Sequence, residues 1–175
     1  MNQGFVVWLT GMSGAGKSTL SEALAPRWRE RGLPVEILDG DAVRPILSAE
    51  LGYTREHRDA NVARIAWVAG LLAKHGAVVL VAAISPYKAA REQARRDIGN
   101  FVEIHVHCTI EELARRDVKG LYKKALAGEI PHFTGVSDPY EAPDNPDVVV
   151  NSAVDSLDDS IQRIEAVLTA KGYLA

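Results

Sequence analysis

The chain has 175 residues, of which 47% are hydrophobic and 25% charged, and its formal net charge is −3. This length accommodates one α/β domain, and the mildly acidic balance gives no overall field for nucleic acid, so an anionic ligand must be held by local arginine and lysine clusters. The single cysteine, Cys108, excludes an intrachain disulfide and fits a reducing compartment. We see no signal segment and no apolar run of membrane-spanning length, and we expect a cytoplasmic protein without nucleic-acid or membrane partners.

A phosphate-binding motif follows a predicted strand at residues 5–9 and opens a predicted helix at 18–31. Residues 11–18 read GMSGAGKS, the G-x-x-x-x-G-K-S pattern of the P-loop. Glycines let backbone N–H groups surround phosphates, Lys17 would reach the β- and γ-phosphates, and the Ser18 hydroxyl would bind Mg²⁺. A glycine-rich turn that fits the pattern by chance is the alternative, but the strand and helix around it favour a site for ATP or GTP. The expected nucleotide contacts are Gly11, Ser13, Gly14, Ala15, Gly16, Lys17, Ser18 and Thr19.

Further apolar runs, at 35–38, 77–82, 101–107 and 148–150, alternate with helical patterns. Their nearly continuous hydrophobicity is typical of parallel strands covered on both faces. Two helices have clear apolar stripes, one over about 55–75 with Thr54 as N-cap and Gly76 as its stop, and one over about 156–170. The sequence therefore predicts a P-loop NTPase fold, a three-layer α/β sandwich with a five-stranded parallel sheet, in one domain over 1–175. The expected buried stripes are Val62, Ile65, Ala66, Ala69 and Leu72 in the first helix, and Leu157, Ile161, Ile164 and Leu168 in the second.

The segment from about 116 to 146 is rich in glycine and proline and contains a basic helical piece at about 121–127. A segment this long and this often interrupted is usually functional in a compact domain. We expect a mobile lid.

Two carboxylates, Asp39 and Asp41, flank Gly40 at the end of the second predicted strand. In open parallel sheets, ligands collect at the carboxyl ends of the strands. One carboxylate can support the metal while the other accepts the proton of an attacking hydroxyl. The alternative is a simple turn in which Asp41 caps a helix that begins near Ala42. The adjacent P-loop favours the catalytic interpretation.

A cluster of arginines follows. Arg44 precedes Arg58, Asn61 and Arg64, and the last three fall on one side of the long helix. Such a pattern is usually a solvated helix face. In a net-acidic chain, however, it indicates an anion site, because the planar guanidinium donates two parallel hydrogen bonds to phosphate or sulfate.

The third strand is followed by Ile84-Ser85-Pro86-Tyr87, in which Pro86 pre-sets a turn or a helix start. Ser85 is therefore expected at the mouth of the site. A phospho-acceptor role is one possibility, but direct in-line transfer needs no covalent intermediate. We favour the Ser85 hydroxyl as a hydrogen-bond donor in the pocket.

Taken together, these motifs resemble the adenylylsulfate kinase (APS kinase) family over about residues 6–151, nearly the whole chain. The lysine-rich block around Lys119 and the later Phe-Thr-Gly are more diagnostic than the P-loop. The motifs are Asp39-Gly40-Asp41, Leu51-Gly52-Tyr53-Thr54, Arg58-x-x-Asn61-x-x-Arg64, Ile84-Ser85-Pro86-Tyr87, residues 116–125, Gly128-Glu129-Ile130, Phe133-Thr134-Gly135 and residues 139–143.

The resemblance implies Mg²⁺-dependent transfer of the ATP γ-phosphate to the 3′-hydroxyl of adenosine 5′-phosphosulfate (APS). It implies that Asp41 is the base, Asp39 supports Mg²⁺ with Ser18, and Lys17 is catalytic. Tyr53 and Phe133 would sandwich the acceptor adenine, although both could instead be anchoring hydrophobes. The other implied roles are Arg44, Arg58 and Asn61 for the phosphosulfate and ribose, Lys119 over the acceptor, Arg116 stacked on the ATP adenine, and Ile84, Ser85, Leu121 and Thr134 as further acceptor contacts.

Three positions depart from the family pattern. Tyr53 replaces a more usual Phe and keeps its ring face. Ala63 occupies a place often held by a second arginine, so we expect one ionic contact to be absent. Residues 81–83 are smaller than usual, which predicts a roomier pocket wall. These departures bear on substrate stringency more than on reaction class.

Other groups are interpreted as structural. His105 and His107 point the same way on a strand but lack a third ligand, so a half-buried strand is favoured over a metal site. Cys108 is interpreted as a small core residue. Arg91, Arg95 and Arg96 are interpreted as a solvated helix face.

Two rival functions remain: a kinase of the same fold for another small hydroxyl compound, and a non-catalytic nucleotide-binding module. Intact Lys17, Ser18, Asp39 and Asp41 argue against the module. The resemblance also implies a homodimer and a possible association with sulfate adenylyltransferase.

Overall fold

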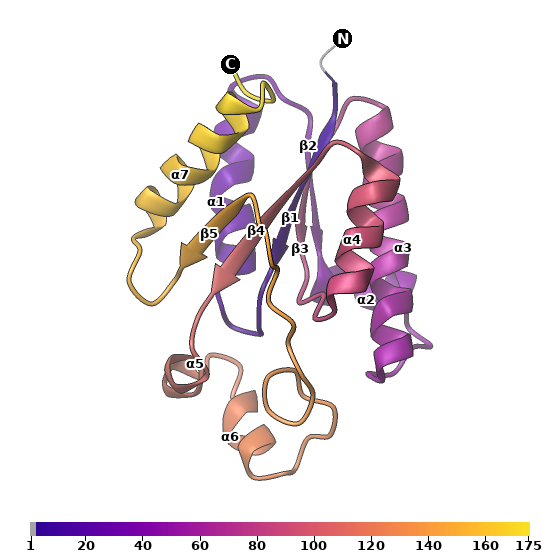
Figure 1. The fold of residues 1–175 in the computed structure, drawn as a ribbon, viewed down its shortest axis with the longest axis vertical. Helices are drawn as coiled ribbons and strands as arrows, with labels where there is room; N and C mark the ends of the chain where they lie inside the picture. Colours follow the sequence, from indigo (N-terminus) through magenta and orange to yellow (C-terminus); the bar gives the residue numbers. More distant parts are fainter. Residues whose placement is uncertain (1–2) are drawn as a thin grey trace.

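The computed structural model describes residues 3–175 and contains one five-stranded, all-parallel sheet (Figure 1). The strand order is β2-β3-β1-β4-β5, so the strand that leads into the P-loop is central. The register pairs Val6 with Val79 of β3 on one side and with Phe101 of β4 on the other. The strands are β1 (Phe5–Thr10), β2 (Val35–Asp39), β3 (Val78–Ala82), β4 (Phe101–His107) and β5 (Val148–Asn151).

Helices cover both faces of the sheet, which confirms the predicted three-layer architecture. In Figure 1, α1 and α7 lie on one side of the sheet and α3 and α4 on the other, while α5 and α6 lie beyond the carboxyl ends of the strands. The helices are α1 (Lys17–Glu30), α2 (Gly40–Leu47), α3 (Arg55–Lys74), α4 (Lys88–Ile98), α5 (Ile110–Arg116), α6 (Leu121–Leu126) and α7 (Leu157–Ala170). Within residues 3–175, no helix combines the length and apolar character needed to cross a bilayer.

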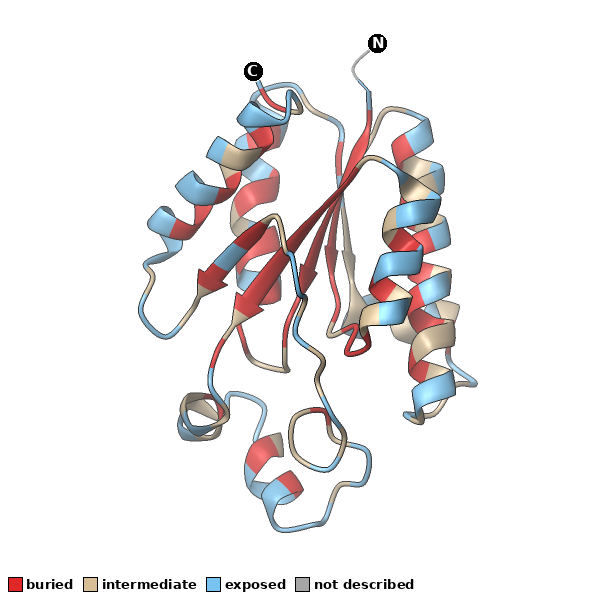
Figure 2. Cartoon of the chain, viewed as in Figure 1, coloured by how far each residue is buried: buried red, intermediate tan, exposed pale blue. Residues whose placement is uncertain are grey.

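The buried residues form two clusters, one on each face of the sheet (Figure 2). Alternation along β1 separates them: Val7 packs with α1 and α7, whereas Val6 and Trp8 pack with α3 and α4. Strands buried on both faces explain why their sequences read as continuous apolar runs. Cys108 is buried in the first cluster, as expected for a small core residue.

The predicted boundaries agree with the structure to within a residue or two. Thr54 caps α3 by accepting from the His57 N–H, as expected, and Ser156 caps α7. The prediction that Leu157 is buried is wrong, because it is the first residue of α7 and its side chain is 44% exposed. The short helix α5 was not predicted.

The interpretation of Arg91 as a solvated residue is also wrong. Arg91 is 2% exposed, and its Nε donates to Glu103 Oε1 of β4 at 2.9 Å. Its Nη1 donates to Ser85 O and its Nη2 to Glu141 O, both at 2.6 Å. A buried guanidinium is tolerated here because each of its three nitrogens donates to an acceptor. Arg91 thus connects α4 to β4, to the segment that follows β3 and to the segment that precedes β5.

Replacement of Arg91 by methionine should lower the free energy of unfolding by about 3 kcal/mol, because the Glu103 carboxylate and two carbonyls lose a buried partner. Arg96→Met, on the exposed side of the same helix, is the matched control and should change it by less than about 0.5 kcal/mol. Urea unfolding of both variants measures the difference. Equal, small effects would show that the Arg91 network contributes little.

Candidate active site

The P-loop crosses from the end of β1 to the start of α1. Gly14 has φ 76° and Gly16 has φ 107°, both in the left-handed region that favours glycine. A Cβ at Gly11 would lie 2.3 Å from the Val106 carbonyl oxygen, so only glycine fits against β4. Since Gly16 has no side chain to cap α1, the first N–H groups of that helix have no side-chain partner there. The loop is shaped to hold phosphate.

Lys17 lies buried at the first position of α1. Its ammonium donates to Gly11 O and Met12 O, each at 2.8 Å, which holds the side chain across the loop. Burial, reinforced by the positive charge of Lys119, lowers the pKa of Lys17 to about 8, although Asp41 and Asp39 oppose that shift. An anionic ligand would strongly favour the charged form of this lysine.

The two carboxylates at the end of β2 and the start of α2, Asp39 and Asp41, have different roles. Asp39 Oδ2 accepts from the Ser18 hydroxyl, and Asp39 Oδ1 accepts from the Asp41 N–H at 2.9 Å. Asp39, and not Asp41, therefore caps α2. The Asp41 side chain is 77% exposed, and within residues 3–175 its one ion-pair partner is Lys119. The alternative interpretation of Asp41 as a helix cap is thereby wrong.

Two cavities meet at this point. The first, about 260 Å³, lies over the P-loop and is lined by Lys17, Ser18 and Lys119 among others. The second, about 90 Å³, lies between α2, α3 and the end of β3. Both cavities are lined by Gly40, Asp41, Ala83 and Ile84. Asp41 thus stands at their common wall, with access to ligands in both.

The second cavity is built by two arginines around Tyr53. The Arg44 guanidinium lies 4.4 Å from the Tyr53 ring centroid and donates to Leu51 O and Gly52 O. The Arg58 guanidinium lies 5.3 Å from the same centroid, and its Nε donates to Tyr53 O at 3.0 Å. The fixed guanidinium planes and the exposed ring offer stacking and positive charge together.

Unsatisfied polar atoms lie in and near this cavity. Asn61 lines the pocket wall, and its buried Oδ1 has no hydrogen-bond partner among residues 3–175. Thr134 Oγ1 is buried and unpaired as well, next to Phe133 and two residues beyond His132, whose carbonyl accepts from Arg58 Nη2 at 2.6 Å. Buried polar atoms normally have partners, so these two indicate the place of a ligand.

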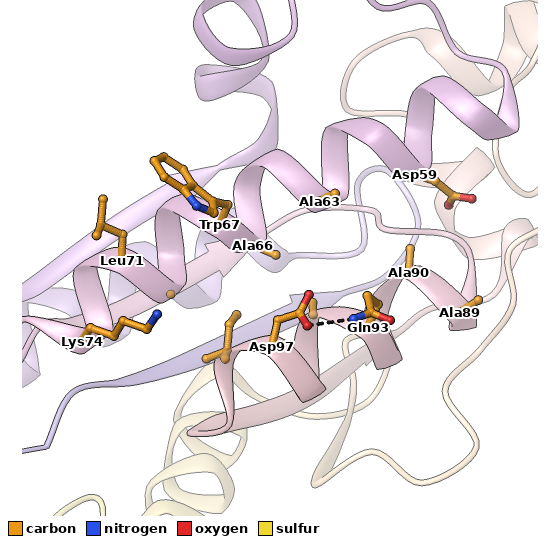
Figure 3. A pocket seen from close by; sticks show the side chains of 13 residues that line it. Asp59, Ala63, Ala66, Trp67, Leu71, Lys74, Ala89, Ala90, Gln93 and Asp97 are labelled. Atoms are coloured by element: carbon orange, nitrogen blue, oxygen red, sulfur yellow. Dashed lines mark hydrogen bonds between the residues drawn. The ribbon is translucent and has the colours of Figure 1, made fainter.

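Several predicted site residues take other roles. The Ser85 hydroxyl accepts from Trp8 Nε1 at 2.9 Å and donates to Ala83 O at 3.1 Å, so it is not the expected pocket donor, although Ser85 lines the second cavity. Arg64 turns away from that cavity to Glu50 and to Leu47 O. Ala63 also lies outside the second cavity, in a groove between α3 and α4 (Figure 3).

The segment predicted as a lid, residues 116–146, contacts the P-loop and the start of α2. Lys119 pairs with Asp41, and the Tyr122 hydroxyl donates to Ser13 O at 2.6 Å. Phe133 meets the Tyr122 ring edge-on at 5.1 Å rather than facing solvent. Tyr122 belongs to the motif at residues 116–125, but its anchoring role on the P-loop was not predicted. Leu121 begins α6 and is half-buried, but it lines neither cavity.

Two further contacts lie beside the P-loop, where the nucleotide would bind. Arg116 donates from Nε to Glu112 Oε1 and from Nη2 to Ser152 O, both at 2.7 Å. Ser152 lies beside the P-loop, because its Cβ would be 3.9 Å from a Cβ at Gly16. Gly135, with φ 89°, leaves room for Met12: a Cβ there would meet Met12 Sδ at 2.5 Å.

Ser18 and Asp39 are suited to Mg²⁺, because they place two hard oxygen donors in direct contact at the donor cavity. Within residues 3–175, no group of three or more His, Cys, Asp or Glu side chains could hold a metal ion. A magnesium ion here would therefore need oxygens from the nucleotide and from water, as this ion usually has in phosphate sites.

The comparisons with known proteins agree with this geometry. The family model described as adenylylsulphate kinase matches residues 3–151. The chain belongs to this family. A curated adenylyl-sulfate kinase from Myxococcus xanthus is 58% identical, with 98% of this chain and 94% of the relative covered. The structure of the Mycobacterium tuberculosis APS kinase in complex with AMPPNP and APS has a TM-score of 0.91 and 40% identity, covering 97% of this chain and 99% of that one.

A third relative has a different length. The probable bifunctional SAT/APS kinase 2 of Sorangium cellulosum is 54% identical over 98% of this chain, which spans only 29% of that protein. The resemblance inferred from the motifs, the P-loop fold and the kinase class are thus confirmed.

The lowered pKa of Lys17 predicts a pH-dependent affinity for nucleotide. Below about pH 8 the ammonium is charged and attracts phosphate; above it the charge is lost. Binding of a non-hydrolysable ATP analogue, followed by calorimetry, should weaken on the order of tenfold between pH 7.5 and 9. Lys17→Met should bind weakly at both pH values. An unchanged wild-type affinity across this range would contradict the assignment.

Proposed function

We propose that the chain transfers the ATP γ-phosphate to the 3′-hydroxyl of APS where the two cavities meet, giving 3′-phosphoadenosine 5′-phosphosulfate. The supporting observation is the common wall: Asp41 lines the P-loop cavity and the arginine-lined cavity at once. A donor phosphate in the first and an acceptor hydroxyl in the second would therefore meet at one carboxylate. In-line transfer requires this end-to-end arrangement.

The proposed mechanism rests on positioning and charge. Lys17 and the P-loop N–H groups hold the donor phosphates and take up developing negative charge. Asp41, which is exposed and not engaged in capping, accepts the proton of the acceptor hydroxyl. Lys119 forms an ion pair with the Asp41 carboxylate. Mg²⁺, held by Ser18 and Asp39, would supply charge neutralisation to the phosphates when bound.

The acceptor has a ribose and phosphosulfate end, which needs charged and polar contacts, and an adenine end, which needs stacking contacts. Arg44, Arg58 and the unpaired Asn61 would bind the ribose and phosphosulfate. Tyr53 and Phe133 would sandwich the adenine, with Ile84, Ser85, Leu121 and Thr134 completing the pocket. The Arg58–His132 hydrogen bond supports this arrangement, since it ties the loop of Phe133 to the acceptor cavity. On the donor side we propose that Arg116, anchored beside the P-loop, stacks on the ATP adenine.

We further propose that the whole chain is one catalytic domain, that residues 116–146 act as a lid, and that the enzyme is a cytoplasmic homodimer. The lone, buried Cys108 supports a reducing compartment. The bifunctional Sorangium relative supports an association with a sulfate-adenylylating partner. Neither rival function has a comparable supporting observation, and a coupled assay of APS against sugars, nucleosides and shikimate tests substrate choice.

Asp41→Ala should lower kcat with APS by at least about a hundredfold, because the acceptor hydroxyl loses its base. ATP affinity should change by less than about threefold, since Asp39 and Lys17 keep their contacts. Asp158→Ala, an exposed position in α7, is the control and should match wild type. Turnover at the wild-type rate in Asp41→Ala would remove this residue from the mechanism.

Phe133→Ala should raise the KM for APS by about tenfold or more and leave the KM for ATP nearly unchanged, because base stacking contributes about 1–3 kcal/mol. Phe133→Tyr retains the ring and serves as the control. Since Phe133 also contacts Tyr122, thermal unfolding of each variant should accompany the kinetics. A parallel rise in both KM values would argue against the sandwich.

A further inference from the structure

A histidine next to the acceptor cavity, the 90 Å³ cavity between α2, α3 and the end of β3, supports one of its walls. His57 is half-buried in the first turn of α3, and its Nδ1 accepts from the Gly52 N–H at 2.9 Å. A Cβ at Gly52 would lie 3.1 Å from the same Nδ1, so the imidazole packs directly against the main chain there. His57 itself lines neither the acceptor cavity nor the P-loop cavity. Any effect of His57 on a ligand would therefore pass through the turn at Gly52.

This turn, residues 51–54, positions the aromatic ring and both arginines of the acceptor cavity. The Gly52 carbonyl accepts from Arg44, and the Tyr53 carbonyl accepts from Arg58 Nε at 3.0 Å. Both guanidiniums also lie over the Tyr53 ring, at 4.4 and 5.3 Å from its centroid. A movement of the main chain at Gly52 would therefore displace the ring and release the arginines together.

The hydrogen bond from Gly52 fixes the protonation state of the imidazole. Because the Gly52 N–H is the donor, Nδ1 must be the unprotonated nitrogen, and the ring is neutral with its proton on Nε2. A proton on Nδ1 would place two N–H donors against each other and break the contact. Histidine is the side chain that ordinarily gains its proton between pH 5 and 8. Mild acid would therefore remove the support of the turn.

Charges of both signs surround this imidazole. The carboxylates of Glu50, before the turn, and Glu56, in α3, interact with it and favour its protonated form. Glu50 also forms an ion pair with Arg64. The guanidiniums of Arg44 in α2 and Arg58 in α3 bond carbonyls of the same turn and disfavour the protonated form. The carboxylates thus stabilise a proton taken up here, although its uptake breaks the contact with the turn.

We propose that His57 is a positioning residue for the acceptor, and that its protonation lowers the affinity of the chain for APS. The inference rests on the proposed function, because it concerns the same acceptor cavity. Neutral His57 holds Tyr53 and the two arginines in the arrangement that binds the acceptor, and protonated His57 releases the turn. APS itself keeps the same charge over this pH range, because both of its acid groups are strong. The pH dependence therefore arises in the protein.

Calorimetric binding of APS, with a non-hydrolysable ATP analogue at saturating concentration, tests the proposal. The APS dissociation constant of the wild type should rise about tenfold from pH 7.5 to pH 5.5, the range over which histidine ordinarily gains its proton. His57→Asn should match the wild type at pH 7.5 and change less than about twofold, because Oδ1 accepts the Gly52 N–H but takes up no proton. A wild-type affinity that is flat over this range, or an equally steep His57→Asn profile, overturns the proposal.

Two further variants separate positioning from a general loss of structure. His57→Leu removes the acceptor at every pH, so its APS dissociation constant should already be raised about tenfold at pH 7.5 and should not change with acid. His75→Asn, at the other end of α3, is the matched control and should keep the wild-type profile. Circular dichroism should be the same for all four proteins at both pH values. A His75→Asn profile as flat as that of His57→Asn would contradict the assignment to His57.

The Gly52 amide gives a readout that does not require APS. In a nuclear magnetic resonance titration of the wild type, the Gly52 amide signal should move together with the His57 ring signals, and in His57→Asn the amide signal should stay in place. If the two signals move together but APS binds at no pH, the proposed reaction fails and the positioning contact stands. If APS is phosphorylated while the Gly52 signal does not follow His57, the positioning role fails and the reaction stands.

Discussion

One hydrogen bond spans the end of β3 and fixes the geometry of the site. The Ser18 hydroxyl donates to Asp39, which joins the P-loop after β1 to the end of β2, although β3 lies between these strands in the sheet. The other oxygen of the same carboxylate accepts the Asp41 N–H. A single side chain therefore aligns two strand ends and starts α2. Because Asp39 does the capping, the Asp41 carboxylate remains exposed where the two cavities join.

The chain beyond the sheet is held mainly through main-chain oxygens. Tyr122 donates to Ser13 O of the P-loop, Arg58 donates to His132 O, and Arg91 donates to Glu141 O. At His132 and Glu141 the segment contributes a main-chain oxygen, which does not depend on side-chain identity, whereas Tyr122 contributes its own hydroxyl. Near its far end, Tyr140 bonds Thr10 at the end of β1 and stacks on His105. Burial of His105 lowers its pKa to about 4, which keeps this contact uncharged at neutral pH.

The sequence predicted the architecture because its signals are local: apolar runs, helical stripes and a motif with fixed spacing. It predicted that the P-loop, Asp39 and Asp41 lie together, because strand ends gather at one edge of a parallel sheet. It failed where a residue's role depends on a partner far along the chain. Nothing near Arg91 shows that Glu103 will lie opposite it, and nothing near Ser85 shows that the Trp8 indole will take its hydroxyl. The same applies to Arg64, whose direction depends on Glu50.

Gly135 gives the fold an unusual evolutionary constraint. Any side chain at this position would press on the sulfur of Met12, and the Met12 carbonyl is one of the two oxygens that hold the Lys17 ammonium. An added methyl group would push aside the Met12 and Ile110 side chains, and the φ of 89° would strain any residue other than glycine. A substitution at this glycine would therefore combine the cost of a left-handed backbone with a repacking of Met12 beside the P-loop.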